Sequence, residues 1–138
     1  APARVVPRPR PAERIGRGGG PHAQGRGDRA HAGGAALGLE PAQWSLSYQS
    51  RFGRERWLEP STLSELDRLA ATGVREVDVV CPGFAVDCIE TLEEVALGLA
   101  EHFKAKGGRL AYIPCLNDAP AHADALARLA CRAAGCEA

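Results

Sequence analysis

The sequence predicts a three-layer α/β fold, in which helices cover a parallel sheet made of βα units. Three observations support this prediction. Short alternating or β-branched segments are each followed by a stretch with apolar residues at helical spacing, this order occurs three times, and Gly or Pro separates the segments. Because one parallel strand reaches the next only through a crossover, repeated βα units favour a single parallel sheet. The 138 residues suffice for one domain with its own core.

The first βα unit begins with WSLSYQS (44–50), which alternates small polar residues with larger apolar ones, as a strand does. After a loop that ends at Pro60, the stretch STLSELDRLAATG (61–73) carries leucines at helical spacing. Gly73 suits the C-terminus of that helix, because glycine readily takes the left-handed conformation found there. We therefore expect a strand at 44–49 with a helix after it.

The second βα unit begins with VREVDVVC (74–81), which is short and β-branched like a strand buried on both faces. The next helix starts near Asp87 and ends at the Gly107-Gly108 pair. Five residues of this helix are expected to form its apolar face: Ile89, Leu92, Ala96, Leu99 and Phe103.

The third βα unit consists of a strand in RLAYIP (109–114) and a helix over 119–134. Asp118 is expected to cap this helix, and Pro120 fits its first turn. Two leucines are expected to face the core, Leu126 and Leu129.

Residues 1–35 differ in composition from the rest of the chain. Ala, Gly, Arg and Pro fill 27 of these 35 positions, and neither Leu nor an aromatic residue occurs among them. A segment with so little apolar bulk cannot offset its ordering entropy, so we expect disorder there and an ordered domain over 36–138. Two origins stay open: a natural arm, or a frame error or mis-called start, since GC-rich DNA read out of frame encodes these four residue types.

Charge and cysteine content exclude several function classes. The 17 basic and 17 acidic residues balance, so we expect no nucleic-acid partner. The sequence has no apolar run of about 18 residues, which predicts no transmembrane segment and leaves peripheral membrane contact open. The five cysteines, without a secretory signal, indicate free thiols in the cytoplasm. An iron–sulfur cluster needs four thiolates, and Cys115, Cys131 and Cys136 are better explained as helix-core thiols. We expect no tightly bound cofactor.

Acidic residues gather where the second helix starts. Ligands of parallel sheets bind beyond the carboxyl ends of the strands, and three loops lie there, at 49–60, 81–87 and 115–120. Asp87 and Glu90 have the spacing of a capping box, and Glu94 lies one turn below Glu90 on the same face. Helix capping with a solvated face explains these carboxylates, and so does a binding site.

The first of these loops holds further candidates. Trp57 lies in the polar stretch RERWLEP, where it either plugs the edge of the sheet or contributes to a site. Ser50 and Arg51 directly follow the first strand, where they form either an ordinary turn or an anion contact.

Three motifs together resemble the C-terminal half of ferrochelatase, the enzyme that inserts Fe²⁺ into protoporphyrin IX. They are YQSRFGRERWLEP (48–60), CPGFAVDCIETLEEV (81–95) and IPCLNDAPAH (113–122). The likeness covers roughly residues 36–130 and is closest to the bacterial form. It implies a class II chelatase fold with two doubly wound halves around a porphyrin cleft, of which this chain supplies one half.

The resemblance also implies roles for individual residues. Glu90 matches the cleft glutamate that binds the metal or takes the pyrrole protons, and Asp87 and Glu94 match its acidic neighbours. Trp57 matches the tryptophan that lines the porphyrin pocket, with three residues expected beside it: Leu58, Ser50 and Arg51. Fe²⁺ is then a substrate and protohaem the product of a lyase. Some family members have His at the position of Cys88.

The chain departs from the family pattern near its N-terminus. The family has a metal-binding His, in a His-Gly stretch, about forty residues before the QSR motif, and that count leads to Pro9, where no His-Gly occurs. The N-terminal half of the family is missing as well, so we expect this isolated chain to be inactive. Two alternatives stay open: a non-catalytic porphyrin- or haem-binding remnant, and a relative of the cobalt or sirohydrochlorin chelatases.

Overall fold

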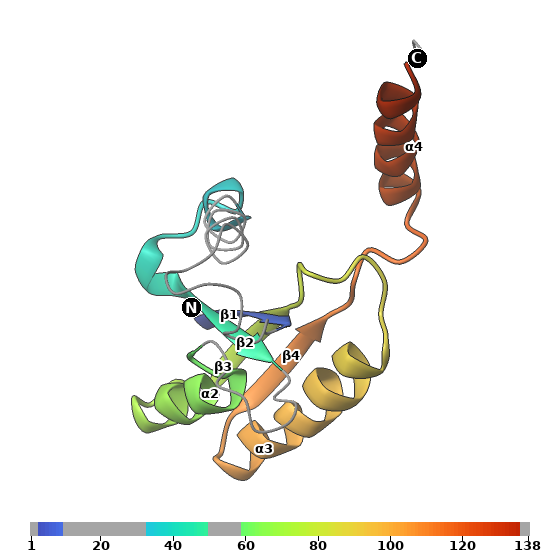
Figure 1. Cartoon of the computed structure of the whole chain (residues 1–138). Helices are drawn as coiled ribbons and strands as arrows, with labels where there is room; N and C mark the ends of the chain where they lie inside the picture. The colour runs from blue at the N-terminus through green and yellow to red at the C-terminus, as the bar shows by residue number, and fades with distance from the viewer. Residues whose placement is uncertain (1–2, 10–32, 50–58, 136–138) are drawn as a thin grey trace, which may run out of the picture.

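The computed structural model describes residues 3–9, 33–49 and 59–135 of the chain (Figure 1). These residues form an α/β domain whose strands all pair in parallel, which confirms the predicted fold class. The sheet has the strand order β2-β1-β3-β4. In chain order the elements are β1 (Ala3–Pro9), η1 (Pro41–Gln43), β2 (Trp44–Gln49), α2 (Thr62–Ala71), β3 (Glu76–Val80), η2 (Glu90–Leu99), α3 (Ala100–Ala105), β4 (Arg109–Ile113) and α4 (Pro120–Ala134).

Strand β1 corrects the prediction that the first 35 residues are disordered, which is wrong over residues 3–9. This strand lies between β2 and β3 and pairs with both of them. The average composition of the segment concealed two adjacent β-branched residues, Val5 and Val6, which favour a strand. In addition, β2 and β3 would each present unpaired backbone groups to the gap between them if β1 were absent. Residues 10–32 of the segment lie outside the described residues.

The pairing of β1 is longer with β2 than with β3. It extends to Pro9 on the β2 side but ends at Val5 on the β3 side. Proline has no N–H to donate, and alternate residues of a strand direct their N–H groups toward the same neighbour. Pro7 and Pro9 therefore each remove a donor from β1, and the ladder to β3 stops at Val79, next to Val80, where β3 itself ends.

Helix α2 and the continuous helix η2–α3 pack side by side on one face of the sheet (Figure 1). Two glycines with positive φ, Gly73 at 87° and Gly107 at 78°, follow these helices where the sequence predicted their ends. The core between helices and sheet consists of Leu66 and Leu69 from α2, Val77, Val79 and Cys81 from β3 and its end, and Val95, Leu99 and Phe103 from η2–α3.

The first ten residues of the second helix are π-helical, and this changes which residues face the core. The buried positions of η2–α3 recur every four residues, at Thr91, Val95, Leu99 and Phe103. Ile89 is 71% exposed and Leu92 46% exposed, so their predicted place on the apolar face is wrong. The prediction assumed α-helical spacing, whereas the i→i+5 hydrogen bonds of a π-helix widen each turn and shift the buried row.

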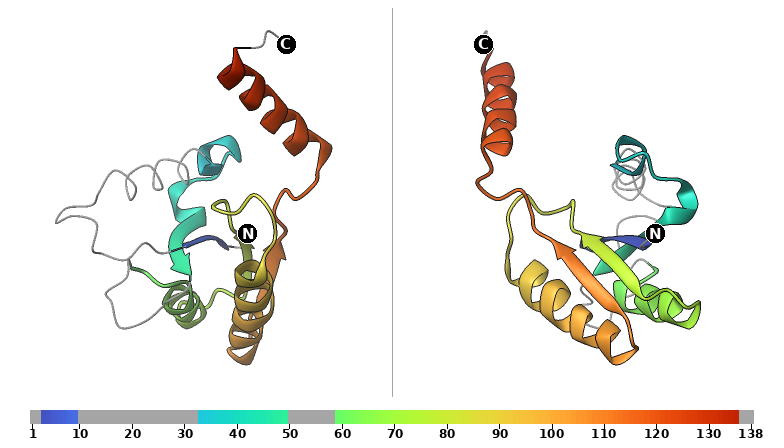
Figure 2. Two further views of the ribbon diagram at one scale, coloured as in Figure 1. Left: turned by 45° about the vertical axis from the view of Figure 1, so that its right-hand side comes forward. Right: turned by 180° about the vertical axis from the view of Figure 1, so that it is seen from behind.

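Helix α4 forms where the sequence predicted it, with Pro120 in its first turn, but it does not pack as expected. None of its residues is buried, and Leu126 and Leu129 are 53% and 59% exposed. Figure 2 shows α4 projecting away from the sheet in both views. The residue that precedes the helix is Ala119, without a side-chain cap, so the predicted cap by Asp118 is wrong as well. Amphipathic spacing predicts a helix but not the surface that it covers.

Candidate functional site

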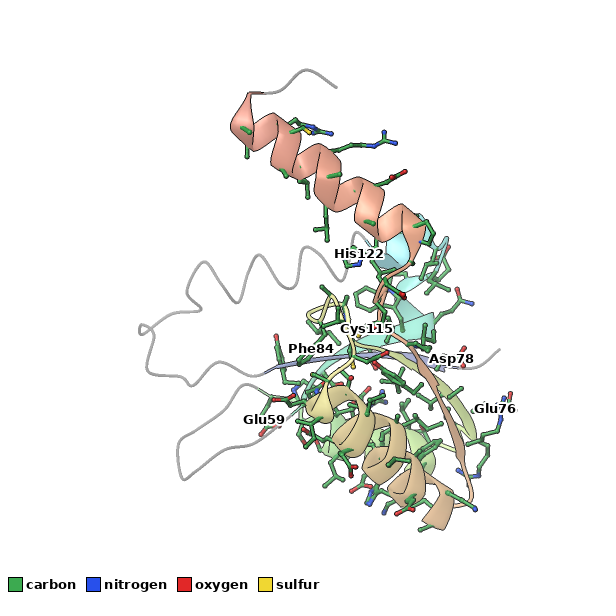
Figure 3. The ribbon with its side chains drawn as sticks, turned by 90° about the vertical axis from the view of Figure 1, so that its right-hand side faces the viewer. Glu59, Glu76, Asp78, Phe84, Cys115 and His122 are labelled. Carbon is green, nitrogen blue, oxygen red and sulfur yellow. The ribbon has the colours of Figure 1, made fainter. Side chains whose placement is uncertain are left out.

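The loops that follow β3 and β4 meet beyond the carboxyl ends of these strands. Figure 3 shows Phe84 and Cys115 near each other there, with His122 above them at the start of α4 and Glu76 at the far end of β3. The N–H of Asn117 donates to the carbonyl of Ala85 at 3.1 Å and so joins the two loops. Asn117 has a φ of 49°, a left-handed conformation that asparagine tolerates. This is the edge at which parallel sheets bind ligands.

The carboxylate of Asp87 ties these loops to the start of η2. Its Oδ1 accepts hydrogen bonds from the Tyr112 hydroxyl at 2.5 Å, the Thr91 hydroxyl at 3.2 Å and the Cys115 N–H at 3.3 Å. Its Oδ2 accepts from Nδ2 of Asn117 at 2.8 Å, and Asn117 Oδ1 in turn accepts the N–H of Asp87 at 2.8 Å. These donors, with Asn117 first and Tyr112 next, hold the pKa of Asp87 well below its usual range.

The partners of Asp87 keep their protons. Burial and the hydrogen bond to Asp87 raise the pKa of Tyr112 far above its usual value. Burial likewise raises the pKa of the Cys115 thiol, whose sulfur lies 3.4 Å from the Tyr112 oxygen. At neutral pH the cluster therefore contains one carboxylate surrounded by neutral donors.

Thr91 caps the first turn of the helix, in place of the predicted capping box. Its buried hydroxyl accepts the N–H of Cys88 at 2.9 Å and lies 3.0 Å from the Cys88 carbonyl. That carbonyl accepts the N–H of Leu92 at 2.9 Å. The Asp87 carboxylate faces the loop after β4, so the capping roles predicted for Asp87 and Glu90 from their spacing are wrong. Thr91 was not predicted because the capping-box pattern has Glu or Gln at that position, not Thr.

Glu90 and Glu94 lie on the first turns of η2, one turn apart. Glu90 is exposed, and hydrogen bonds from the Cys88 thiol and from its own N–H lower the pKa of its carboxyl. Glu94 is half-buried and lines a hollow of about 540 Å³, whose other described walls include Tyr48, Leu99 and His102. The two glutamates thus occupy different surroundings, one open to solvent and one beside a cavity.

Two polar residues at strand ends also belong to the site and were not singled out from the sequence. Gln49 ends β2 and is 1% exposed, and it contacts the Glu90 backbone. Asn117 follows β4 and holds Asp87 from the other side. The signal available in the sequence was a polar side chain at the end of a strand or in the loop that follows it, a position that ordinary turns share.

The structure leaves some predicted site residues untested. Trp57, Leu58, Ser50 and Arg51 lie outside the described residues, so their part in porphyrin binding stays a prediction. The position to which the count from the QSR motif leads does lie among the described residues. Pro9, near which the count from the QSR motif ends, pairs with Gln49 at the carboxyl edge of the sheet.

The side chains that could hold a metal ion are few at this edge. Within residues 3–9, 33–49 and 59–135, no group of three or more His, Cys, Asp or Glu is arranged to hold one. Four cysteines in that part of the chain are free thiols: Cys81, Cys88, Cys115 and Cys131.

No helix among the described residues is long and apolar enough to cross a membrane.

Comparison with a solved structure defines the class of fold. The structure of a putative cobalamin (vitamin B12) biosynthesis CbiX protein from Marinobacter aquaeolei VT8 matches with a TM-score of 0.61. The match covers 97% of this chain and 98% of that one at 13% sequence identity. The protein therefore has the fold of that CbiX protein, with its candidate site at the carboxyl edge of the sheet.

Sequence comparison then gives the family. The ferrochelatase family model matches residues 11–134, and this chain belongs to the ferrochelatase family. The match begins well before residue 36, where composition had placed the start of the ordered domain. A ferrochelatase of Stenotrophomonas maltophilia R551-3 is 55% identical over 118 residues, and one of Xylella fastidiosa M12 is 61% identical over 99 residues.

The chain corresponds to only part of these relatives. The two matches cover 86% and 72% of this chain, but 37% and 31% of the respective relatives. A ferrochelatase of Xanthomonas axonopodis pv. citri 306, 54% identical over 121 residues, is covered over 38% of its length. The chain therefore spans about a third of the length of the curated relatives it matches.

Proposed function

We propose that this chain carries one side of a site that inserts Fe²⁺ into protoporphyrin IX to form protohaem, with Glu90 as proton acceptor and iron ligand. The observation that carries the proposal is the position of Glu90 in a chain of the ferrochelatase family. Its carboxylate is exposed at the start of a helix, and that start is tied to the carboxyl edge of the sheet through Asp87. A reacting group must be open to its substrate and fixed in place, and Glu90 meets both conditions.

The chemistry of metal insertion explains the choice of a carboxylate. A free porphyrin carries two pyrrole N–H protons, which a base must remove before the four nitrogens can bind a divalent metal. The Glu90 carboxylate is ionised at neutral pH, so it attracts Fe²⁺, and its exposed oxygens are open to a proton, although its lowered pKa makes it a weaker base. An oxygen ligand also suits an iron ion that must be passed on, whereas thiolates hold such ions more strongly.

Asp87 has a different role in this proposal from the one that the family resemblance implied. Its two oxygens accept hydrogen bonds from Tyr112, Thr91, Cys115 and Asn117, and its pKa is lowered by them. A carboxylate with its lone pairs occupied in this way is a poor proton acceptor. We therefore assign Asp87 to positioning the helix start. Glu94, one turn further along beside the hollow, remains the acidic neighbour of Glu90.

The site proposed here is half of a larger one. The chain spans about a third of its relatives' length, and Pro9 occupies the strand end where the resemblance expects a histidine. For these reasons we propose that lyase activity requires the remainder of a full-length ferrochelatase, and that the 138-residue chain alone is inactive. The free thiols support a cytoplasmic setting.

A chimera tests the role of Glu90. In this chimera, residues 36–138 replace the matching segment of the Stenotrophomonas maltophilia enzyme, which supplies everything before it. Glu90→Gln should lower the rate of iron insertion about 10²- to 10⁴-fold, the usual contribution of a general base, with porphyrin affinity unchanged. Glu93→Gln is the matched control, because Glu93 is an exposed carboxylate of the same helix. Near-normal turnover by Glu90→Gln would refute the assignment.

A second candidate is a porphyrin- or haem-binding function without catalysis. The absence of a histidine at the end of β1 favours it, since porphyrin contact needs the apolar pocket but not the metal ligands. Titration of the 138-residue chain with protoporphyrin IX, followed by tryptophan fluorescence, distinguishes the two. Quenching at micromolar porphyrin by a chain that inserts no iron supports the binding function, and no quenching contradicts it.

A further inference from the structure

Gln49 links the end of β2 to the first residue of η2 through a buried amide. Its side chain is 1% exposed, and its Nε2 donates to the backbone carbonyl of Glu90 at 3.3 Å. Its Oε1 accepts from the thiol of Cys81, a residue 2% exposed directly after β3, at 3.4 Å. One amide thus joins three elements that are distant in the sequence.

The orientation of this amide follows from the chemistry of its partners. A backbone carbonyl can only accept a hydrogen bond, so the NH₂ end of Gln49 must face Glu90. The oxygen end then faces Cys81, which can donate because burial raises the pKa of its thiol to about 12 and keeps it protonated. Both ends of the buried amide are satisfied, as buried polar groups usually are.

The contact reaches the helix at the residue that the proposed function depends on. The carbonyl oxygen of Glu90 has two lone pairs, so it can accept Gln49 in addition to an N–H of its own helix. A donor from outside the helix that binds a carbonyl of its first turn fixes that turn relative to the sheet. Asp87 holds the same turn from the β4 side, so the helix start is anchored on two sides.

We propose that Gln49 is a positioning residue for Glu90, which sets the place of the first helical turn against the end of β2 and β3. The functional meaning of this proposal rests on the role proposed for Glu90, but the structural claim does not. Glu90 reaches its substrate only from the turn that Gln49 holds, and a displacement of about 1 Å in such a group costs substantial rate.

Amide hydrogen exchange of the 138-residue chain tests the proposal without any catalytic assay. Gln49→Met keeps the length of the side chain but removes both hydrogen bonds. The amide of Leu92 donates to the Cys88 carbonyl in the first turn. In this variant it should exchange about five- to tenfold faster relative to the amide of Phe103. This is the change expected for loss of the one hydrogen bond that reaches the helix, from Gln49 to the Glu90 carbonyl. Equal acceleration of both amides would show a merely structural role and overturn the proposal.

Gln49→Glu provides a conservative rescue. A protonated carboxyl can donate to the Glu90 carbonyl as the amide does, whereas a carboxylate cannot. Relative protection of Leu92 should therefore be near normal at low pH and fall as the pH rises, with no such change of the ratio in the unmodified chain. A ratio that stays constant with pH in Gln49→Glu would overturn the proposal.

Variants of Cys81 cover the case in which Gln49→Met does not fold. Cys81→Ser retains a donor to Oε1 of Gln49 and should leave the ratio of the Leu92 to the Phe103 exchange rate unchanged. Cys81→Ala removes that donor and should raise this ratio. Identical ratios in the two variants would contradict the linkage. Because none of these measurements involves iron or porphyrin, failure of the proposed function in the Glu90→Gln assay leaves their outcome intact.

Discussion

The hydroxyl of Thr91 should contribute measurably to the stability of the helix that presents Glu90. Thr91 is fully buried, and it accepts the N–H of Cys88 at 2.9 Å. Thr91→Val keeps the shape of the side chain and removes that acceptor, which leaves a partly buried N–H without its partner. Such an orphaned donor costs about 1–3 kcal/mol, and we expect the free energy of unfolding to fall by that amount.

Urea unfolding of the 138-residue chain measures this loss. With a denaturant dependence of about 1–3 kcal/mol per molar urea, the midpoint should fall by roughly 1 M. Thr91→Ser, which keeps the hydroxyl and loses one methyl group, is the matched control. It should retain slow exchange of the Cys88 amide, whereas Thr91→Val should lose it. Unchanged stability and unchanged Cys88 exchange in Thr91→Val would refute the reasoning about this cap.

Two further predictions concern the hydrogen bonds of Asp87 and the packing of Phe103. The pKa of Asp87 is lower in the folded chain than its unfolded value of about 3.9, so its contribution to stability is present above that pH and lost as the pH falls below it. Asp87→Asn should flatten the fall in urea midpoint below about pH 4, and an unchanged acid profile would contradict this. A Cβ at Gly108 would overlap the ring of the fully buried Phe103, so Gly108→Ala should cost about 1–3 kcal/mol. Adding Phe103→Leu should recover part of that cost in a double-mutant cycle, and strictly additive losses would argue against the contact.

Much of the fold could be predicted from the sequence because local patterns specify it. The strands at 44–49, 74–81 and 109–114 were predicted within two residues at each end, since β-branched and alternating segments between turn residues are strong local signals. The ends of the helices followed from Gly73 and Gly107 for the same reason.

The errors occurred where a property depends on contacts between distant segments. The composition of residues 1–35 does not reveal that β1 completes the sheet between β2 and β3. Helical spacing does not distinguish an α-helix from the π-helical turns of η2, which exchange Leu92 for Thr91 on the buried face. Nor does amphipathicity indicate whether the apolar face of α4 has a surface to cover.

The candidate site shows the same contrast between features set by local sequence and features set by distant contacts. The sequence identified the acidic helix start and, through the family resemblance, Glu90 within it. It did not identify the polar residues that hold this start, because Gln49, Tyr112 and Asn117 come from β2, β4 and the loop after β4, which only the folded sheet brings together. The residue proposed to react is thus suggested by a motif, whereas the residues that hold its helix were found only in the structure.

Iron insertion by the isolated chain and by the chimera, measured side by side, tests the central claim that this chain carries the Glu90 side of an incomplete chelatase site. Both proteins are given Fe²⁺ and protoporphyrin IX under reducing conditions, and the initial rate of protohaem formation is recorded by absorbance. We predict a clear rate for the chimera and none above the uncatalysed background for the isolated chain. A folded chimera without activity, or an isolated chain as active as the chimera, would contradict the account.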